Sequence, residues 1–254
     1  MNTRAFRILT QALLCMSAWA INPAGAQTAA AEGFSGDAGA MVVASRSVVQ
    51  GGASEQVLRP YVYGDWGRFL ARVDTFGLRV MPMGQGSLEL LARASTEGFK
   101  ASRTAFTGVS DRATPLPVGL GTFQRTELGA YWLYALHDTR SSGQLVELTW
   151  AGRIPAGPLT LYPQLGLEYR SAAYVQHLFG VSPAEARASG LAAYAPQASV
   201  VPVATLQATW PLTGAWALQT QARYRHWDGP VRHSPLVQDA GQWSGLLALT
   251  RTWP

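Results

Sequence analysis

Residues 216–225 alternate without a break between two kinds of side chain. Trp216 and Leu218 belong to an apolar set, and Gln219 and Arg223 belong to a polar set. Successive side chains of a strand point to opposite faces, so this segment predicts a strand with one apolar and one polar face. The pattern recurs along the chain. Together with the export signal described next, it favours a membrane barrel with an apolar outside, a polar lumen and a closed backbone ladder.

The N-terminus has the features of a secretory signal. Arg4 and Arg7 precede an apolar run over residues 8–15, and Ala24, Gly25 and Ala26 form a small-residue cleavage site. We therefore expect residues 1–26 to be a signal peptide. Its removal takes away the one cysteine, which excludes disulfides, cysteine catalysis and thiolate metal sites. The formal charge then falls from +5 to +3, because two arginines leave. That excess is too small to indicate a nucleic-acid partner.

The remaining residues predict an all-β fold, a transmembrane antiparallel up-and-down β-barrel. We expect the barrel over residues 41–254, after a periplasmic tail over residues 27–40. Twelve strands are expected, at residues 41–49, 57–64, 67–74, 76–81, 86–95, 98–106, 128–136, 146–150, 159–169, 199–210, 214–228 and 242–253. The count falls to ten if 67–81 is one bent strand and 98–106 is a loop. Barrels of this kind have an even number of strands.

Loop lengths predict the orientation. Short turns at residues 155–158 and 211–214 fall on the periplasmic side, and the longer segments 171–198 and 229–241 fall outside, as is usual for such barrels. Residues 107–124 are an exception, because this reading makes them a long periplasmic segment.

Aromatic residues near the strand ends predict two girdles at the membrane interfaces. The alternative is that the tryptophans fill the core of an exported β-sandwich. The row at residues 128–136 is expected to face lipid. The periplasmic girdle would contain Trp150, Trp210, Trp216 and Trp253, and the outer girdle Tyr134, Tyr169 and Tyr224.

Charged residues on the polar faces are expected to line the lumen. Opposite charges in a water-poor interior should pair, because an unpaired buried charge costs several kcal/mol, by rough estimate. Such a network would fill a narrow barrel, although the same side chains could line a small conduit. The predicted lumen charges are Glu89, Arg93, Glu127, Glu147, Glu168, Arg223 and Arg225.

The segment at residues 171–198 contains a helix signal. Ser182, Pro183 and Glu185 form a capping box with proline at the first helical position, and Gly190 is a stop. We expect a short helix in this extracellular loop, as a structural lid or as part of a ligand site.

Three motifs resemble the MipA/OmpV family. The most specific lies at residues 174–194, a weaker one at 116–121 with residues 127–129, and a third at 234–236. His177 and Leu178 depart from the aromatic pair expected there. The residues that carry the first resemblance are Tyr174, Phe179, Gly180, Ser182, Pro183, Glu185, Gly190 and Tyr194.

The resemblance implies an outer-membrane protein of a Gram-negative bacterium. The family's named role is a scaffold that joins a murein-cleaving lytic transglycosylase to a bifunctional murein synthase. Other members are linked to adhesion or antibiotic response. We expect as partners the murein hydrolase and synthase, outer-membrane lipid and lipopolysaccharide, and no nucleic acid. The candidate periplasmic partner segment is 107–124, with the tail as a second candidate; it contains Leu116, Gly119, Leu120 and Gly121.

The sequence disfavours catalysis and predicts no metal or cofactor. The four histidines show no His-x-x-x-His metal spacing. His226 and Asp228 share a face, but that face is the one expected to meet lipid, and His233 and Ser234 are chain neighbours. A small channel and a surface module remain as alternative functions.

Overall fold

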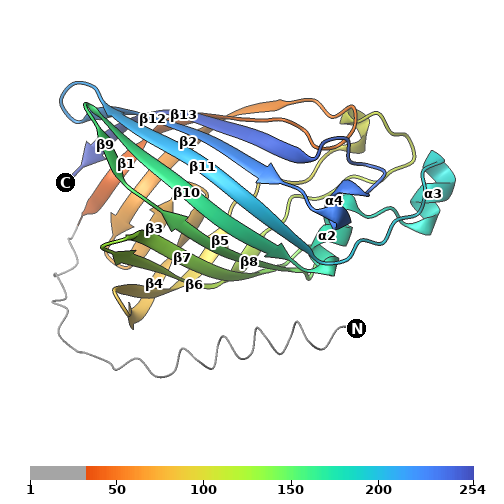
Figure 1. Ribbon diagram of the computed structural model, residues 1–254, viewed down its shortest axis with the longest axis horizontal. Helices are drawn as coiled ribbons and strands as arrows, with labels where there is room; N and C mark the ends of the chain where they lie inside the picture. Colours follow the sequence, from red (N-terminus) through yellow and green to blue (C-terminus); the bar gives the residue numbers. More distant parts are fainter. Residues whose placement is uncertain (1–32) are drawn as a thin grey trace. The chain divides into compact units, whose positions relative to one another are not determined.

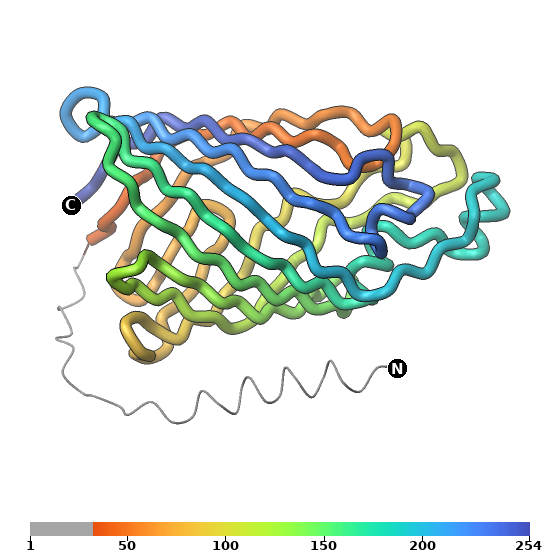
Figure 2. The backbone as a smooth tube through the Cα atoms, in the orientation of Figure 1, coloured from red at the N-terminus to blue at the C-terminus, as the bar shows by residue number. Residues whose placement is uncertain are grey.

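The strands close into one antiparallel barrel in a computed structural model (Figures 1 and 2). β1 pairs with both β2 and β13, and β10 pairs with β11, so the sheet has no free end strand. β8 and β9 lie one after the other along the same edge of β10 and form one interrupted strand, which makes twelve. The expected twelve-stranded barrel is confirmed. Its strands are β1 (Phe34–Ser45), β2 (Glu55–Trp66), β3 (Phe69–Arg72), β4 (Thr75–Met83), β5 (Gly86–Arg93), β6 (Pro117–Thr126), β7 (Gly129–Asp138), β8 (Gln144–Ala151), β9 (Ile154–Ala156), β10 (Leu159–Arg170), β11 (Ser199–Pro211), β12 (Trp216–His226) and β13 (Gly241–Trp253).

The structure describes residues 33–254. The expected signal peptide and residues 27–32 lie outside the described residues. β1 begins at Phe34, so residues 34–40, which we had assigned to a tail, belong to the barrel wall. No helix among the described residues is long and apolar enough to cross a membrane.

The two ends of the barrel differ in the length of their connections. At one end the strands are joined by short turns, at residues 67–68, 84–85, 127–128, 157–158 and 212–215. At the other end lie the longer segments 46–54, 94–116, 171–198 and 227–240, and the helices α2 (Ala172–Phe179), α3 (Pro183–Ser189) and α4 (Gly229–Arg232) (Figure 1). We assign the end with short turns to the periplasm and the end with the helices to the outside.

One predicted strand was wrong. Residues 98–106 form no strand; they lie in the outer segment 94–116 and contain the short 3-10 helix η2 (Ala101–Arg103). The strand that follows β5 is instead β6, which begins within residues 107–124, the segment that we had placed in the periplasm. β6 lacks the expected alternation of apolar and polar side chains, because Gly121 lies on its inner face. A Cβ on Gly121 would come within 2.3 Å of the Tyr134 ring and 2.8 Å of Leu91, so glycine leaves room for both side chains.

The row at residues 128–136 also faces the other way. Trp132, Tyr134 and Leu136 point into the barrel, and Tyr134 is 4% exposed. Both faces of β7 are apolar, so alternation could not decide between them. The register decides, because Tyr134 lies opposite Glu147 of β8 and both side chains point inward.

The outer half of β2 has a neighbour on one side only. β3 is four residues long and pairs with Tyr63–Trp66, so residues 55–62 contact β1 but no second strand among the described residues. Pro60 lies in this stretch, and proline suits an edge because it has no N–H to pair. The β3–β4 hairpin turns at Val73 with φ 68°, a costly conformation for a β-branched residue. The wall is therefore interrupted here.

Candidate functional site

A network of buried charges crosses the barrel at its outer half. Glu168 of β10 accepts hydrogen bonds from three arginines, at 2.7 Å from Arg170 and 3.1 Å from Arg225, and also from Arg223. Arg170 continues the network to Glu97 at 2.6 Å, and its side chain is 1% exposed. A carboxylate among three guanidinium groups satisfies charges that could not be buried singly.

The network lies below aromatic rings that belong to the outer segments. The guanidinium of Arg170 is 5.1 Å from the Trp227 ring centroid and 5.5 Å from that of Tyr174. The hydroxyl of Tyr174 donates to Glu97 at 2.9 Å. Burial raises the pKa of Glu97, but the nearby Arg170 and Arg225 lower it by more than burial raises it. The pKa of Glu97 is therefore below its ordinary value. These contacts tie the lumen to the segments above it.

A second ion pair lies beside this network, because Glu147 of β8 is the cross-strand neighbour of Glu168. Arg93 of β5 pairs with Glu147 of β8, and its guanidinium is 5.7 Å from the Tyr134 ring centroid. Glu89 is 2% exposed and accepts a hydrogen bond from Ser87. Of the predicted lumen charges, Glu127 does not lie in the lumen: it lies in the exposed turn between β6 and β7.

Sequence reasoning missed several lumen charges. Arg170 follows Glu168 by two residues, so the strand period could have placed it on the same face. Glu97 comes from the irregular segment 94–116, where no period applies. A third group joins Asp65 of β2 to Arg72 and Arg79 at 3.0 and 2.7 Å.

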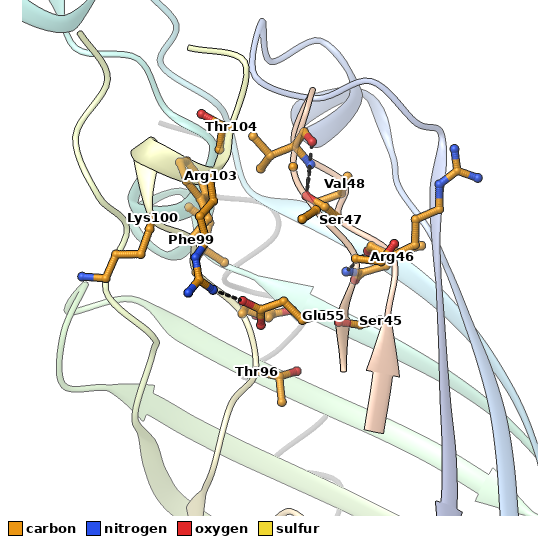
Figure 3. Close-up of a pocket in the computed structure, with 18 of the residues that line it drawn as sticks. Ser45, Arg46, Ser47, Val48, Glu55, Thr96, Phe99, Lys100, Arg103 and Thr104 are labelled. Carbon is orange, nitrogen blue, oxygen red and sulfur yellow. Dashed lines mark hydrogen bonds and ion pairs between the residues drawn. The ribbon is translucent and has the colours of Figure 1, made fainter. Parts of the chain in front are cut away.

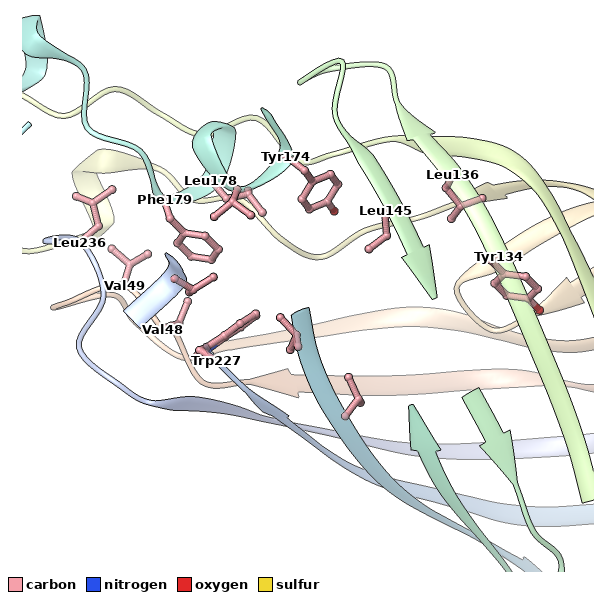
Figure 4. Close-up of a cluster of buried hydrophobic side chains, with 14 of the residues drawn as sticks. Val48, Val49, Tyr134, Leu136, Leu145, Tyr174, Leu178, Phe179, Trp227 and Leu236 are labelled. Atoms are coloured by element: carbon pink, nitrogen blue, oxygen red, sulfur yellow. The ribbon is translucent and has the colours of Figure 1, made fainter. Parts of the chain in front are cut away.

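The outer mouth of the barrel is closed by a hydrophobic plug. α2 begins after Ser171, whose hydroxyl accepts from the Tyr174 N–H, and it buries Tyr174, Val175, Leu178 and Phe179. Phe179 meets Trp227 edge to face at 5.8 Å. Figure 4 shows these side chains converging with residues from the outer segments and the upper barrel wall. The plug comprises α2 with Val48, Val49, Val109, Leu136, Leu145, Val181, Val201, Trp227, Val231 and Leu236.

The predicted capping box forms in α3. The Ser182 hydroxyl accepts a hydrogen bond from the Glu185 N–H, and the Glu185 carboxylate accepts one from the Ser182 N–H. Gly190 ends the helix with φ 75°. Glu185 also accepts from Arg112 at 2.8 Å and from the Ser110 N–H at 2.9 Å. Burial raises the pKa of Glu185, but the bonds from Arg112 and the Ser182 and Ser110 N–H groups lower it far more, so it lies well below its ordinary value.

The remaining residues of the 174–194 motif bind the outer segments to one another. The Gly180 carbonyl accepts from Arg112 at 2.8 Å, and the Tyr194 hydroxyl donates to the Pro230 carbonyl at 2.9 Å. Ser234 of the third motif donates to the Phe179 carbonyl at 2.6 Å. The first and third motifs therefore meet at the plug, where their bonds hold its segments together.

The segment proposed as a periplasmic platform does not lie in the periplasm. Leu116 ends the outer segment, where its N–H donates to Asp138, and Gly119, Leu120 and Gly121 lie within β6. Leu120 is about half exposed on the outer wall. The position of β6 therefore corrects the prediction of a periplasmic partner segment.

The predicted girdles are placed as follows. Trp210, Trp216 and Trp253 are exposed near the periplasmic strand ends, and Trp150 donates its indole N–H to the Leu128 carbonyl in a periplasmic turn. Tyr169 and Tyr224 lie on the outward faces of β10 and β12, near their outer ends. Tyr134 points inward instead. The prediction missed further outward rings, among them Trp66 and Phe69 near the periplasm and Trp243, which packs 4.9 Å from Tyr224.

Two cavities of similar size lie among the described residues of the barrel. One, of about 580 Å³, lies at the interruption of the wall between residues 45–57 and 96–104, where Arg103 and Glu55 pair at 3.4 Å (Figure 3). The other, of about 630 Å³, fills the periplasmic half of the lumen below the charge network. Its lining comes from strands on every side of the barrel.

The histidines do not converge with acids and hydroxyls. His226 lies beside the Tyr224 ring on the outward face, whereas Asp228 accepts from Ser199 and the Val200 N–H. The His177 ring lies 2.7 Å from the Ala113 carbonyl. Among residues 33–254, no cluster of metal-ligating side chains occurs.

Known proteins resemble this chain over most of the barrel. The chain is 30% identical to the MltA-interacting protein of Escherichia coli (strain K12) over 147 residues, which are 57% of this chain and 58% of that protein. It is 25% identical over 183 residues to the outer membrane protein YiaT of the same organism, covering 70% and 74%. It is also 25% identical over 144 residues to the outer membrane protein OmpV of Vibrio cholerae, covering 56% of each.

The match to the family model is broader than any of these alignments. The model of the MltA-interacting protein MipA matches residues 38–253, from β1 to the last residue of β13. The chain therefore belongs to the MltA-interacting protein MipA family.

Proposed function

We propose that this chain is a non-enzymatic outer-membrane scaffold that holds murein-cleaving and murein-synthesising enzymes at the periplasmic face. The proposal starts from the printed name of a relative, MltA-interacting protein, of which this chain matches little more than half. An N-terminal signal would export the chain, and lipid with lipopolysaccharide would surround the barrel in a Gram-negative outer membrane. The exposed apolar side chains of the outer wall support the proposal that lipid surrounds the barrel.

The single observation that supports the scaffold is the asymmetry between the two ends. The plug and the charge network close the outer mouth, whereas among residues 33–254 only short turns occupy the periplasmic end. A protein closed outward and accessible from inside is suited to periplasmic partners.

We place the docking surface on the tips of the periplasmic turns. Leu128 is 77% exposed and Leu212 is 51% exposed. Large apolar side chains at turn tips have no packing role in the barrel, and such groups are typical of protein interaction surfaces. This surface replaces residues 107–124 as the platform.

Affinity capture tests the proposal. The tagged full chain is crosslinked in intact cells, extracted in detergent, and its partners are identified by mass spectrometry. We expect the wild type to capture a lytic transglycosylase and a murein synthase. The double variant Leu128→Glu and Leu212→Glu should lose both enzymes while keeping its heat-modifiable barrel.

The matched control is Leu116→Glu, which alters a similarly exposed leucine at the outer end. Equal capture by the wild type and the double variant would show that the turn tips are not the docking surface. A folded wild type that captures neither enzyme would refute the scaffold.

A channel is less well supported by the geometry. Conduction would require movement of the plug, whose side chains Val175, Val201 and Leu236 have no exposed surface. A role in adhesion or antibiotic response would use the outer segments, and no contact within them favours it.

A further inference from the structure

The periplasmic half of the lumen forms a blind vestibule. Its walls reach from Tyr134 and Arg223 at the depth of the charge network down to Thr126 and Thr209 at the periplasmic strand ends. The plug and the network close its outer end, and the turns at its inner end are short. The volume of about 630 Å³ is in the range of small-molecule sites, roughly 300–1,000 Å³. Access is therefore from the periplasm.

Aromatic rings line the vestibule on several sides. Phe123 and Trp132 stack at 6.1 Å, and neither belongs to the buried core. Rings that border a cavity offer apolar faces to a ligand, and the tyrosine hydroxyls add polar handles. The inward rings are Tyr61, Tyr63, Phe123, Trp132, Tyr134 and Tyr162.

Between the rings stands a belt of amides and hydroxyls. Gln207 of β11 lies opposite Gln221 of β12, and Thr209 donates to Gln219 at 2.6 Å. Gln164 of β10 completes the belt. A glutamine amide both donates and accepts, so this belt suits a ligand with many hydroxyl and amide groups. Rings combined with amides match a sugar, whose ring carbons are apolar and whose edge is polar.

Two arginines of the lining are available to an anion. Of the five arginines here, three have acidic partners; of the three carboxylates, Glu147 pairs with Arg93, and Asp37 and Asp74 have no arginine within ion-pair distance among the described residues. Arg125 and Arg153 have no acidic group within ion-pair distance among residues 33–254, and both lie at the periplasmic mouth. Guanidinium groups bind carboxylates through paired hydrogen bonds.

We propose that the vestibule binds an anionic, N-acetylated disaccharide from the periplasm. The rings would stack on the sugar, the glutamines would bind its hydroxyl and acetamido groups, and Arg125 with Arg153 would hold its carboxylate. The choice of this sugar class rests on the proposed function, because murein strands contain N-acetylated sugars that carry a carboxylate. The scaffold would then hold a product or substrate fragment beside its enzymes.

Isothermal titration calorimetry on the full chain in detergent tests this. The probes are the disaccharide of N-acetylglucosamine and N-acetylmuramic acid, which has a free carboxylate, and neutral N,N′-diacetylchitobiose. We expect the acidic probe to bind at least tenfold more tightly. Arg125→Gln with Arg153→Gln should remove this preference, and Trp132→Leu should weaken both probes at least tenfold. Arg103→Gln, in the outer cavity, is the matched control and should change neither.

The outcomes that overturn the inference are separate from failure of the scaffold. No heat of binding for either probe with a folded wild type would refute the site. Equal affinity for both probes would refute the role of the arginines, and binding unchanged by Trp132→Leu would refute this location. Enzyme capture by the Trp132→Leu variant should stay at the wild-type level. Failure of the wild type to capture either enzyme would count against the scaffold alone.

Discussion

Glu168 provides the sharpest test of the interior. Its carboxylate is 3% exposed and contacts Arg170, Arg223 and Arg225. Glu168→Gln keeps the shape of the side chain but removes its charge, so Arg170 keeps its ion pair with Glu97 whereas Arg223 and Arg225 lose theirs. Breaking a buried ion pair by removing one partner costs about 3–5 kcal/mol. Arg223 and Arg225 are 24% and 16% exposed, so solvent screens them partly, and we expect a loss of about 3 kcal/mol.

The free energy of unfolding is measured by urea titration of the barrel in lipid vesicles, followed by tryptophan fluorescence. The matched control is Glu127→Gln, in an exposed turn, which should change stability by less than about 0.5 kcal/mol. The double variant Glu168→Gln and Arg223→Gln should recover part of the loss, because Arg223 has no other acidic partner within ion-pair distance in the described part of the chain. If Glu168→Gln behaves like Glu127→Gln, the network does not contribute to stability and the reasoning is wrong.

Three further predictions concern the hairpin, the outer helix and the plug. Val73→Gly should stabilise the barrel by about 1 kcal/mol, because glycine adopts a positive φ without the strain that valine meets; Val73→Ala should bring no such gain, and equal effects of the two in urea titrations would contradict this. The pKa of Glu185 is lowered in the folded state, so its stabilisation of α3 is full above its ordinary value of 4.5 and is lost as pH falls below it; the hydrogen-exchange protection of residues 183–189, measured relative to the intrinsic exchange rate at each pH, should fall from pH 7 to pH 3, and Glu185→Gln should flatten that fall. The wild type should give no stepwise conductance in planar bilayers, whereas replacing residues 172–189 with a Gly-Ser linker should produce steps; steps from the wild type would show that the plug does not seal the lumen.

Alternation was informative where the two faces of a strand differ in polarity. Trp216 and Leu218 lie outside, and Gln219 and Arg223 lie inside, as the pattern of residues 216–225 predicted. The capping box likewise predicted α3, because the signals that start and stop a helix are local. The difference in connection length between the two ends of the barrel can likewise be counted along the chain.

The same reasoning failed where a face carries no contrast. β7 is apolar on both sides, so only its pairing with β8 turns Tyr134 inward. β6 escaped notice because glycine occupies its inner face, where the Tyr134 ring needs the space. No sequence pattern could predict the direction of Tyr134 or the position of β6, because both depend on the neighbouring strand.

The sequence by itself determined that this protein is a barrel, which faces of its clearly alternating strands point outward, and the helix signals of its outer segments. These follow from local periodicity and from the need to pair every backbone group in a membrane. The tertiary structure decided what the barrel encloses. Arg112 reaches Glu185 across 73 residues, Glu97 reaches Arg170 from an irregular segment, and the plug closes one mouth while a vestibule stays accessible at the other. Such contacts depend on which strands become neighbours when the sheet closes, and that information is not local.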